Sequence, residues 1–270
     1  MLITELERFI HEDVGDDDTS CSIVPEVWVH ARIITKEKGV IAGLEECRQV
    51  IDYFGLEFES GFDDGDAINP GDVVADVWGM APDVLRAERL SLNFLCRMSG
   101  IATVTARCVA DAGGVRVACT RKTTPGFRMF EKKAVRLGGG DTHRFNLSDA
   151  VMIKDNHIAI MGIENAIRAA RKEASFTKKI EVEVTSADEM LAAAKAGADI
   201  IMFDNMLPGE IQQCIRTLED ATLREGLILE ASGGINPGNI SEYASTGVSV
   251  VSMGSLIHSS HWLDMSLDIL

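Results

Sequence analysis

The stretch IEVEVTSADEMLAAAKAGADIIMFD, from Ile180 to Asp204, decides the fold class. A short apolar run rich in β-branched residues (Lys179–Val184) precedes a helical pattern (Ser186–Ala198), and a second apolar run follows (Asp199–Asp204). Apolar runs of this length are typical of strands buried on both faces. A strand, a helix and a strand in succession predict a right-handed crossover and a parallel sheet.

The same alternation continues on both sides of this unit. Four more segments have the strand pattern: Val115–Thr120, Asp149–Lys154, Leu227–Ser232 and Val248–Gly254. Helical patterns separate them, as in Glu164–Ala174 and Pro208–Ala221. Because six strands fall short of the roughly eight that close a barrel, we expect an open-sided α/β barrel.

The first hundred residues have a different pattern. Helical and strand-like segments are mixed there: Ile3–His11, Val27–Glu37, Gly43–Phe54 and Gly71–Gly79. This mixture predicts a separate α+β layer domain. A long helical pattern, from Pro82 to about Ala112, is expected to join it to the barrel.

Composition limits the class of protein. The 270 residues are 46% hydrophobic and carry a net charge of −16, which is typical of a globular chain and unfavourable for a nucleic-acid partner. No apolar run reaches the ~20 residues that span a bilayer, and the N-terminus lacks a signal-peptide pattern, so we expect no membrane partner and a cytoplasmic location. The six cysteines form no CxxC pair and are expected to be buried free thiols.

One segment contrasts with this acidity. Between Thr120 and Arg144 stand seven Lys or Arg residues and two acids, a local charge of 7 − 2 = +5. Four of these basic residues lie on a predicted helix and are expected to be solvent-exposed: Arg128, Lys132, Lys133 and Arg136. The others are expected to bind a small anion.

Polar residues follow the predicted strands, where ligands gather in parallel α/β folds. The cations Arg121, Lys122, His143, Arg144 and Lys154 predict a pocket for a small polyanion. The carboxylates Glu183 and Asp204 would suit Mg²⁺, directly or through water.

Two glycine-bearing stretches add to this site. SGGINPGN, residues 232–239, joins a strand to a helix start and offers bare backbone amides to an anion, and Gly254 with Ser255 could form a second wall. GGGDTHR, residues 138–144, predicts a loop whose backbone approaches a ligand closely.

The chain resembles the quinolinate phosphoribosyltransferase family, the carboxylating nicotinate-nucleotide pyrophosphorylases. Nine blocks carry the resemblance in the family's order: EDVGDDDTS, ERLSLNFLCRMSGIAT, TRKTTPGFR, GGGDTHR, DAVMIKDNH, IEVEV, AGADIIMFDN, LEASGGI and VVSMGSLIHS. It implies the type II phosphoribosyltransferase fold. We thus expect an N-terminal α/β sandwich (1–105), an open (β/α) barrel (106–255) and a C-terminal segment (256–270) that returns to the first domain.

The resemblance also implies an activity and roles. The family transfers phosphoribosyl from phosphoribosyl pyrophosphate to quinolinate with decarboxylation, using Mg²⁺, in NAD biosynthesis. Arg121, His143 and Arg144 would bind quinolinate, and Lys122 and Lys154 would be shared between the two substrates. Glu183 and Asp204 would hold the ribose and Mg²⁺, while Ser232, Gly233, Gly234, Gly254 and Ser255 would form the phosphate site. The catalytic set would be Lys122, Lys154, Glu183 and Asp204, and in a homodimer Arg89 would reach the neighbouring site.

Three alternatives stay open. Molybdenum-transport-associated homologues share the fold, but they tend to lose the KDNH block, which is intact here as Lys154–His157. A barrel aldolase would form a Schiff base between Lys154 and a carbonyl substrate, and this reaction would not need the other cations. A non-catalytic anion-binding protein would not need Glu183 and Asp204.

Overall fold

The computed structural model describes residues 1–15 and 18–270, which divide into two compact units. One consists of residues 1–106, 129–139 and 260–270, and the other of residues 107–128 and 140–259. Residues 129–139, which we expected within the barrel, therefore group with the N-terminal segment. Asp16 and Asp17, from the EDVGDDDTS block, lie outside the described residues.

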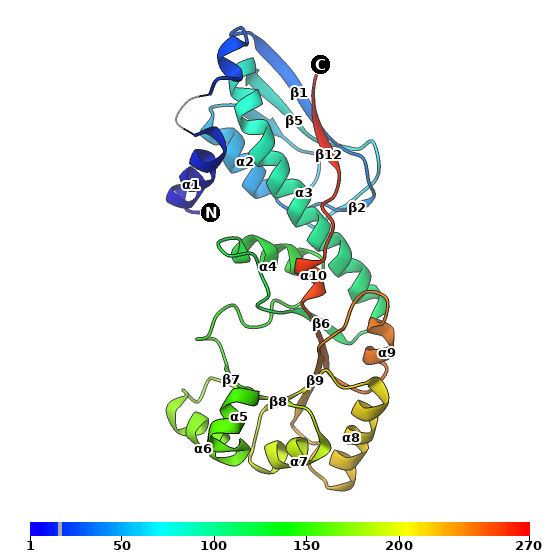
Figure 1. The fold of residues 1–270 in the computed structure, drawn as a ribbon. Coiled ribbons are helices and arrows are strands. Elements are labelled where there is room, and N and C mark those ends of the chain that lie inside the picture. The colour runs from blue at the N-terminus through cyan, green and yellow to red at the C-terminus, as the bar shows by residue number, and fades with distance from the viewer. Residues whose placement is uncertain (16–17) are drawn as a thin grey trace. The chain divides into compact units, whose positions relative to one another are not determined.

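The first unit is built on an antiparallel sheet with the strand order β12-β1-β5-β3 (Figure 1). Its strands are β1 (Trp28–Thr35), β3 (Glu57–Glu59), β5 (Val73–Met80) and β12 (Met265–Ile269), and β2 (Gly39–Val40) pairs with β4 (Ala67–Ile68). Helices α1 (Ile3–Val14) and α2 (Leu44–Tyr53) and the 3₁₀ turn η1 (Cys21–Ile23) belong to this unit, and so do residues 81–106 of α3 (Ala81–Asp111) and residues 129–137 of α4 (Arg128–Leu137). The C-terminal strand β12 thus lies beside β1.

Helix α4 packs into the core of this unit. Phe130 forms edge-on ring contacts with Phe9 of α1 and Phe94 of α3, at centroid distances of 5.8 and 5.1 Å. Lys132 is buried, and Lys133 lies 2.9 Å from the buried carboxylate of Glu46. The expectation that these two lysines are solvent-exposed is therefore wrong. Periodicity alone could not show that acidic partners from α2 would cover this face of the helix.

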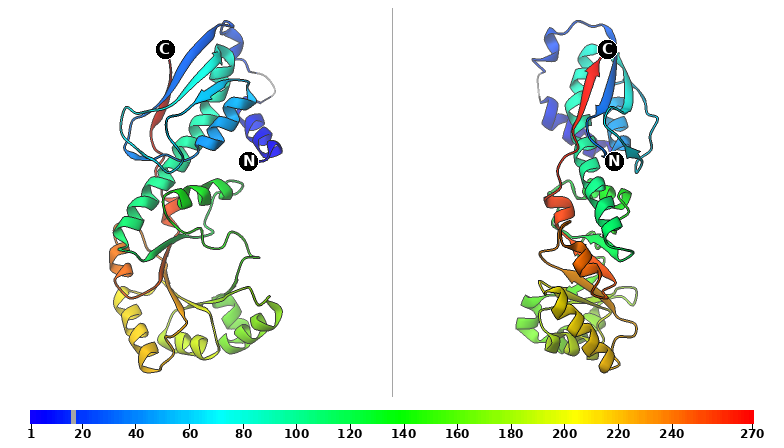
Figure 2. Two further views of the ribbon diagram at one scale, coloured as in Figure 1. Left: turned by 180° about the vertical axis from the view of Figure 1, so that it is seen from behind. Right: turned by 90° about the vertical axis from the view of Figure 1, so that its right-hand side faces the viewer.

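The second unit contains a parallel sheet with the order β6-β11-β10-β9-β8-β7, which leaves an open side between β6 and β7 (Figures 1 and 2). All six predicted barrel strands are confirmed: β6 (Arg116–Cys119), β7 (Val151–Ile153), β8 (Ile180–Val184), β9 (Ile200–Asp204), β10 (Ile228–Ser232) and β11 (Val250–Met253). The helices are α5 (Asp155–Met161), α6 (Ile163–Glu173), α7 (Ala187–Lys195), α8 (Pro208–Asp220), α9 (Ile240–Ala244) and α10 (Ser255–His258).

The pleat of these strands decides which side chains face the barrel interior. In β8, Val182 and Val184 are fully buried, and Glu181 and Glu183 point the other way because side chains alternate along a strand. The helices cover the outer face of the sheet (Figure 2). Polar residues at alternate positions of the strands therefore gather inside the barrel.

Candidate active site

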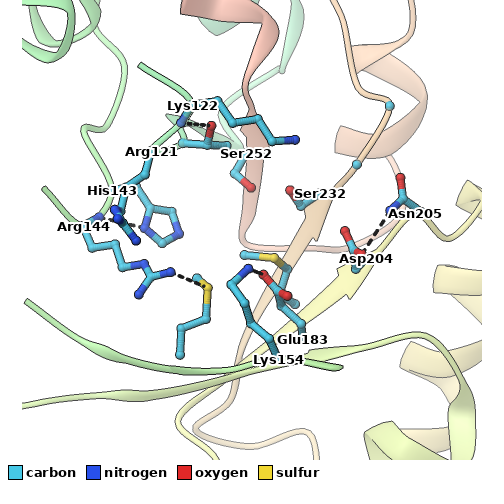
Figure 3. Close-up of a pocket in the computed structure, with 15 residues that line it drawn as sticks. Arg121, Lys122, His143, Arg144, Lys154, Glu183, Asp204, Asn205, Ser232 and Ser252 are labelled. Atoms are coloured by element: carbon cyan, nitrogen blue, oxygen red, sulfur yellow. Dashed lines mark hydrogen bonds and ion pairs between the residues drawn. The ribbon is translucent and has the colours of Figure 1, made fainter. Parts of the chain in front are cut away.

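A cavity of about 520 Å³ opens at the carboxyl ends of the barrel strands, entirely within the second unit (Figure 3). It brings together ten of the residues expected at the site: Arg121, Lys122, His143, Arg144, Lys154, Glu183, Asp204, Ser232, Gly233 and Gly234. Eight of them come from the ends of β8, β9 and β10 or from loops that follow β6, β7 and β10, and His143 and Arg144 come from the loop between α4 and β7. Side chains that are up to 113 positions apart in sequence, from Arg121 to Gly234, thus share one pocket.

Five other lining residues were not anticipated: Thr120, Met152, Met202, Asn205 and Ser252. A signal for three of them was present in the sequence. Met152, Met202 and Ser252 each stand two positions before an expected site residue at the end of the same predicted strand, and positions i and i+2 share a face. Thr120 is the last residue of its predicted strand, and Asn205 directly follows Asp204, so neither has such a signal.

Three expected residues do not line this cavity. Gly254 lies next to Lys122, since an added Cβ would be 3.1 Å from the Lys122 side chain. Ser255 donates a hydrogen bond to the Ile235 carbonyl oxygen at 2.9 Å and so supports the turn that contains Gly233 and Gly234. Arg89 belongs to the first unit, and its side chain is 63% exposed, with Glu88 at 3.8 Å.

The cationic side of the cavity is formed after β6 and by the glycine-rich loop. That loop runs beside β6, because Asp141 exchanges backbone hydrogen bonds with Val117 and Cys119. The Asp141 carboxylate accepts a hydrogen bond from the His143 backbone N–H at 2.7 Å, and His143 adopts a φ of 51°. The left-handed turn at His143 directs the next residue, Arg144, into the cavity (Figure 3).

Two polar atoms on this side are buried without a hydrogen-bond partner among the described residues. They are Nε of Arg121 and Oγ of Ser252, and both residues line the cavity. Arg144 contacts the Met152 sulfur at 2.9 Å, and burial lowers the pKa of its guanidinium. Buried donors of this kind favour an anionic ligand, since an unpaired donor is costly to bury.

The opposite side carries the carboxylates. Glu183 forms an ion pair with Lys154, and the Asp204 carboxylate accepts a hydrogen bond from the Asn205 amide at 3.0 Å (Figure 3). Ser232 follows at the end of β10, and then Gly233 and Gly234 with φ values of 91° and 67°. Consecutive left-handed glycines leave backbone N–H groups open to an anion.

Beneath the cavity lies a buried carboxyl pair, Glu181 and Glu230, that sequence reasoning missed. Burial, with repulsion from Glu230 next, raises the pKa of Glu181 to about 7. His143 Nε2 lies 3.3 Å from Glu230 and 3.8 Å from Glu181. The same ring accepts a hydrogen bond from the Arg144 backbone N–H at Nδ1, which places its hydrogen on Nε2. Nε2 thus turns an N–H group, and not a lone pair, toward the carboxyls, which disfavours this cluster as a metal site.

Three carboxylates of the first unit lie close enough together to hold a metal ion, but a lysine ammonium already lies among them. Glu45, Glu46 and Asp64 surround the Lys133 ammonium at 2.6, 2.9 and 3.4 Å. Among the described residues, no helix has the length and apolar character needed to cross a membrane.

Known proteins resemble the chain over nearly its whole length. A protein from Methanothermobacter thermautotrophicus, named a probable carboxylating nicotinate-nucleotide pyrophosphorylase, is 50% identical over 98% of this chain and 97% of its own. The human nicotinate-nucleotide pyrophosphorylase [carboxylating] is 39% identical over 88% of this chain and 82% of its own. The crystal structure of NadC from Streptococcus pyogenes superposes with a TM-score of 0.90 at 42% identity, covering 99% and 96% of the two chains.

Family models agree with these likenesses. Residues 16–99 match the N-terminal domain of quinolinate phosphoribosyl transferase, and residues 101–268 match its C-terminal domain. Together the two matches cover well over half of the chain. The solved relatives share the fold over nearly the whole chain. The chain belongs to the quinolinate phosphoribosyltransferase family.

Proposed function

We propose that this protein transfers phosphoribosyl from phosphoribosyl pyrophosphate to quinolinate with loss of CO2, giving nicotinate mononucleotide and pyrophosphate for NAD biosynthesis. One observation carries the proposal. A single cavity holds a cationic side with Arg121 and Arg144, a glycine turn suited to phosphate, and two carboxylates between them. Two anionic substrates and an electron-poor sugar need these three surfaces.

Quinolinate would occupy the cationic side. Its two carboxylates would meet Arg121, whose Nε is buried and unpartnered among the described residues, and Arg144. A planar guanidinium binds a carboxylate through two parallel hydrogen bonds, which fixes the ring plane as well as the charge. His143 lines the cavity beside these two arginines (Figure 3).

The phosphoribosyl donor would occupy the other side. Its 5'-phosphate would bind the backbone amides at Gly233 and Gly234 with the Ser232 hydroxyl, and Asp204 would accept hydrogen bonds from the ribose hydroxyls. Lys122 and Lys154 would face the pyrophosphate. This arrangement presents C1 of the ribose to the ring nitrogen of quinolinate.

The residues also fit a magnesium ion. Glu183 and Asp204 line the same cavity and offer the hard oxygen ligands that Mg²⁺ prefers, with substrate oxygens and water completing its shell. When bound, the ion would neutralise charge on the pyrophosphate. Because Glu183 is also paired with Lys154, the carboxylate has a protein partner before any cation arrives.

The chemistry requires no covalent nucleophile. The bond from C1 to the pyrophosphate oxygen breaks with its electron pair leaving on oxygen, and the quinolinate nitrogen forms the new bond to C1. Asp204 and Glu183 stabilise the electron-poor ribose, and Lys154 stabilises the leaving group. The pyridinium then accepts the electrons of the breaking carbon–carboxylate bond, CO2 leaves, and the ring carbon takes up a proton. The protein holds two anions together that repel each other in water.

The test is an assay of the purified protein. Incubation with quinolinate, phosphoribosyl pyrophosphate and Mg²⁺ should yield nicotinate mononucleotide and one CO2 per turnover. Nicotinate should react at least ~10-fold less efficiently, because one buried cation would stay unpaired. Turnover of nicotinate at a comparable rate, or no product from quinolinate, would rule out the proposal.

Two further expectations belong to this proposal. We propose that the protein acts as a homodimer in which Arg89 reaches the neighbouring site, supported by the exposure of this side chain and its place in the ERLSLNF block. We also propose a cytoplasmic location. Six buried free cysteines suit a reducing compartment.

A further inference from the structure

Asn205 holds an unusual backbone conformation at the edge of the cavity. It is the residue that follows β9, and its φ is 55°, in the left-handed region that most side chains avoid. Asparagine tolerates this region better than most residues. Its backbone N–H donates to the Ser232 carbonyl oxygen at 2.9 Å, which joins the end of β9 to the end of β10.

The side chain of Asn205 turns back onto the neighbouring carboxylate. Its amide nitrogen donates to Oδ2 of Asp204 at 3.0 Å (Figure 3). A carboxylate offers two oxygens, so this contact fixes the plane of Asp204 and leaves Oδ1 for a ligand. An amide partner does this without adding charge to a cavity that must bind anions.

Asn205 also lies against the glycine turn. A Cβ added at Gly233 would be 2.3 Å from Asn205 Oδ1 and 2.7 Å from its backbone nitrogen. Gly233 itself has a φ of 91°, so Asn205 can lie this close to the turn only because residue 233 is a glycine. The carboxylate of Asp204 and the glycine turn therefore contact the same residue from two sides.

We propose that Asn205 is a positioning residue for the phosphoribosyl donor, setting the carboxylate of Asp204 relative to the Gly233–Gly234 turn. The inference rests on the proposed function, in which the carboxylate contacts the ribose and the turn binds its 5'-phosphate. The two groups must match the fixed distance from the ribose hydroxyls to the phosphate. Asn205 takes no part in the cationic side that would bind quinolinate.

Two substitutions separate positioning from folding. Asn205→Gly keeps the left-handed backbone and removes the amide, and Asn205→Asp keeps the size and the backbone preference but replaces the donor by a negative charge. Thr222→Gly is the matched control, since Thr222 has a φ of 56° and an exposed position just after α8. Each protein would be compared by KM for both substrates, kcat, quinolinate affinity by calorimetry, and melting temperature.

Both Asn205 variants should raise the KM for phosphoribosyl pyrophosphate at least fivefold, with the larger effect in Asn205→Asp because its charge repels Asp204. Quinolinate affinity should stay within twofold of the unaltered protein, and Thr222→Gly should change neither. An equal rise in both KM values, an unchanged KM for the donor, or loss of folding in both variants would overturn the inference. If the unaltered protein makes no nicotinate mononucleotide, the proposed function fails instead.

Discussion

The ammonium group of Lys154 is ion-paired with the carboxylate of Glu183, so a cation and an anion of the cavity neutralise each other in the structure. Pyrophosphate must compete with Glu183 for this lysine. Replacing Glu183 by Gln should tighten the binding of inorganic pyrophosphate by about two- to fivefold, because an ion pair that is still partly open to solvent contributes up to ~1 kcal/mol.

Calorimetry with pyrophosphate in the presence of a chelator tests this expectation. Lys154→Met should bind pyrophosphate more weakly than the unaltered protein. Glu225→Gln removes the same charge from an exposed turn and serves as the control. If Glu183→Gln and Glu225→Gln bind pyrophosphate equally well, the pair does not limit access to Lys154.

Asp204 and Arg144 should show opposite defects. Asp204→Asn should lower the single-turnover rate at saturation by about 100-fold or more, since it removes charge that stabilises the electron-poor ribose. Arg144→Ala should weaken quinolinate binding by at least ~10-fold, because it removes a charged partner of a carboxylate. Calorimetry and rapid-quench measurements on both variants separate the two effects. The assigned roles are wrong if Asp204→Asn loses quinolinate affinity and keeps its rate.

Glu181 makes stability depend on pH. Burial, then repulsion from Glu230, raises its pKa from 4.5 to about 7. Between these values the unfolded chain releases a proton that the folded protein keeps, so stability is lost as the pH rises from about 4.5 and the loss is complete above about 7.

Glu181→Gln removes this penalty. At pH 8 the variant should be more stable than the unaltered protein by about 1 to 3 kcal/mol, and near pH 4.5 the advantage should vanish. Urea unfolding across this range measures the difference, with Glu225→Gln as the control. A constant difference between Glu181→Gln and the unaltered protein at all pH values would contradict the explanation.

Lys133 should be important for the stability of the first unit. Burial alone would lower the pKa of this lysine, but its hydrogen bonds to Glu45 and Glu46 raise it. Lys133→Met leaves the buried Glu46 without its cation and should cost about 2 to 4 kcal/mol of unfolding free energy. Lys36→Met, which breaks an exposed pair 3.7 Å long with Asp264, should cost less than ~1 kcal/mol. Equal losses in urea unfolding would show that burial of Lys133 is unimportant.

A shared active site predicts complementation between two inactive chains. Arg89→Ala and Lys154→Ala should each be inactive alone. A refolded mixture should regain part of the activity, because one of the two sites in a hybrid dimer carries both original residues. Mixtures without any activity at every ratio would exclude a site built from two chains.

Sequence periodicity was sufficient for the barrel and for most of the cavity. Apolar runs with helical segments between them predicted six parallel strands. Polar residues that follow the carboxyl ends of parallel strands must lie close together at one end of the barrel. Arg121, Lys154, Glu183 and Asp204 were therefore identifiable before their contacts were known. Met152, Met202 and Ser252 could have been found from the same alternation, since a strand places positions i and i+2 on one face.

Only the tertiary structure decided which charges neutralise one another. The sequence shows Lys133 on a basic helix, but burial against Glu46 depends on α2, more than 80 positions away. It shows Glu181 and Glu230 as separate strand residues, and only the sheet order brings both to His143. The role of Asn205 likewise depends on contact with Gly233. Local patterns specify strands and faces, because these depend on neighbours in the chain, whereas charge pairing and pKa depend on distances that the packed fold sets.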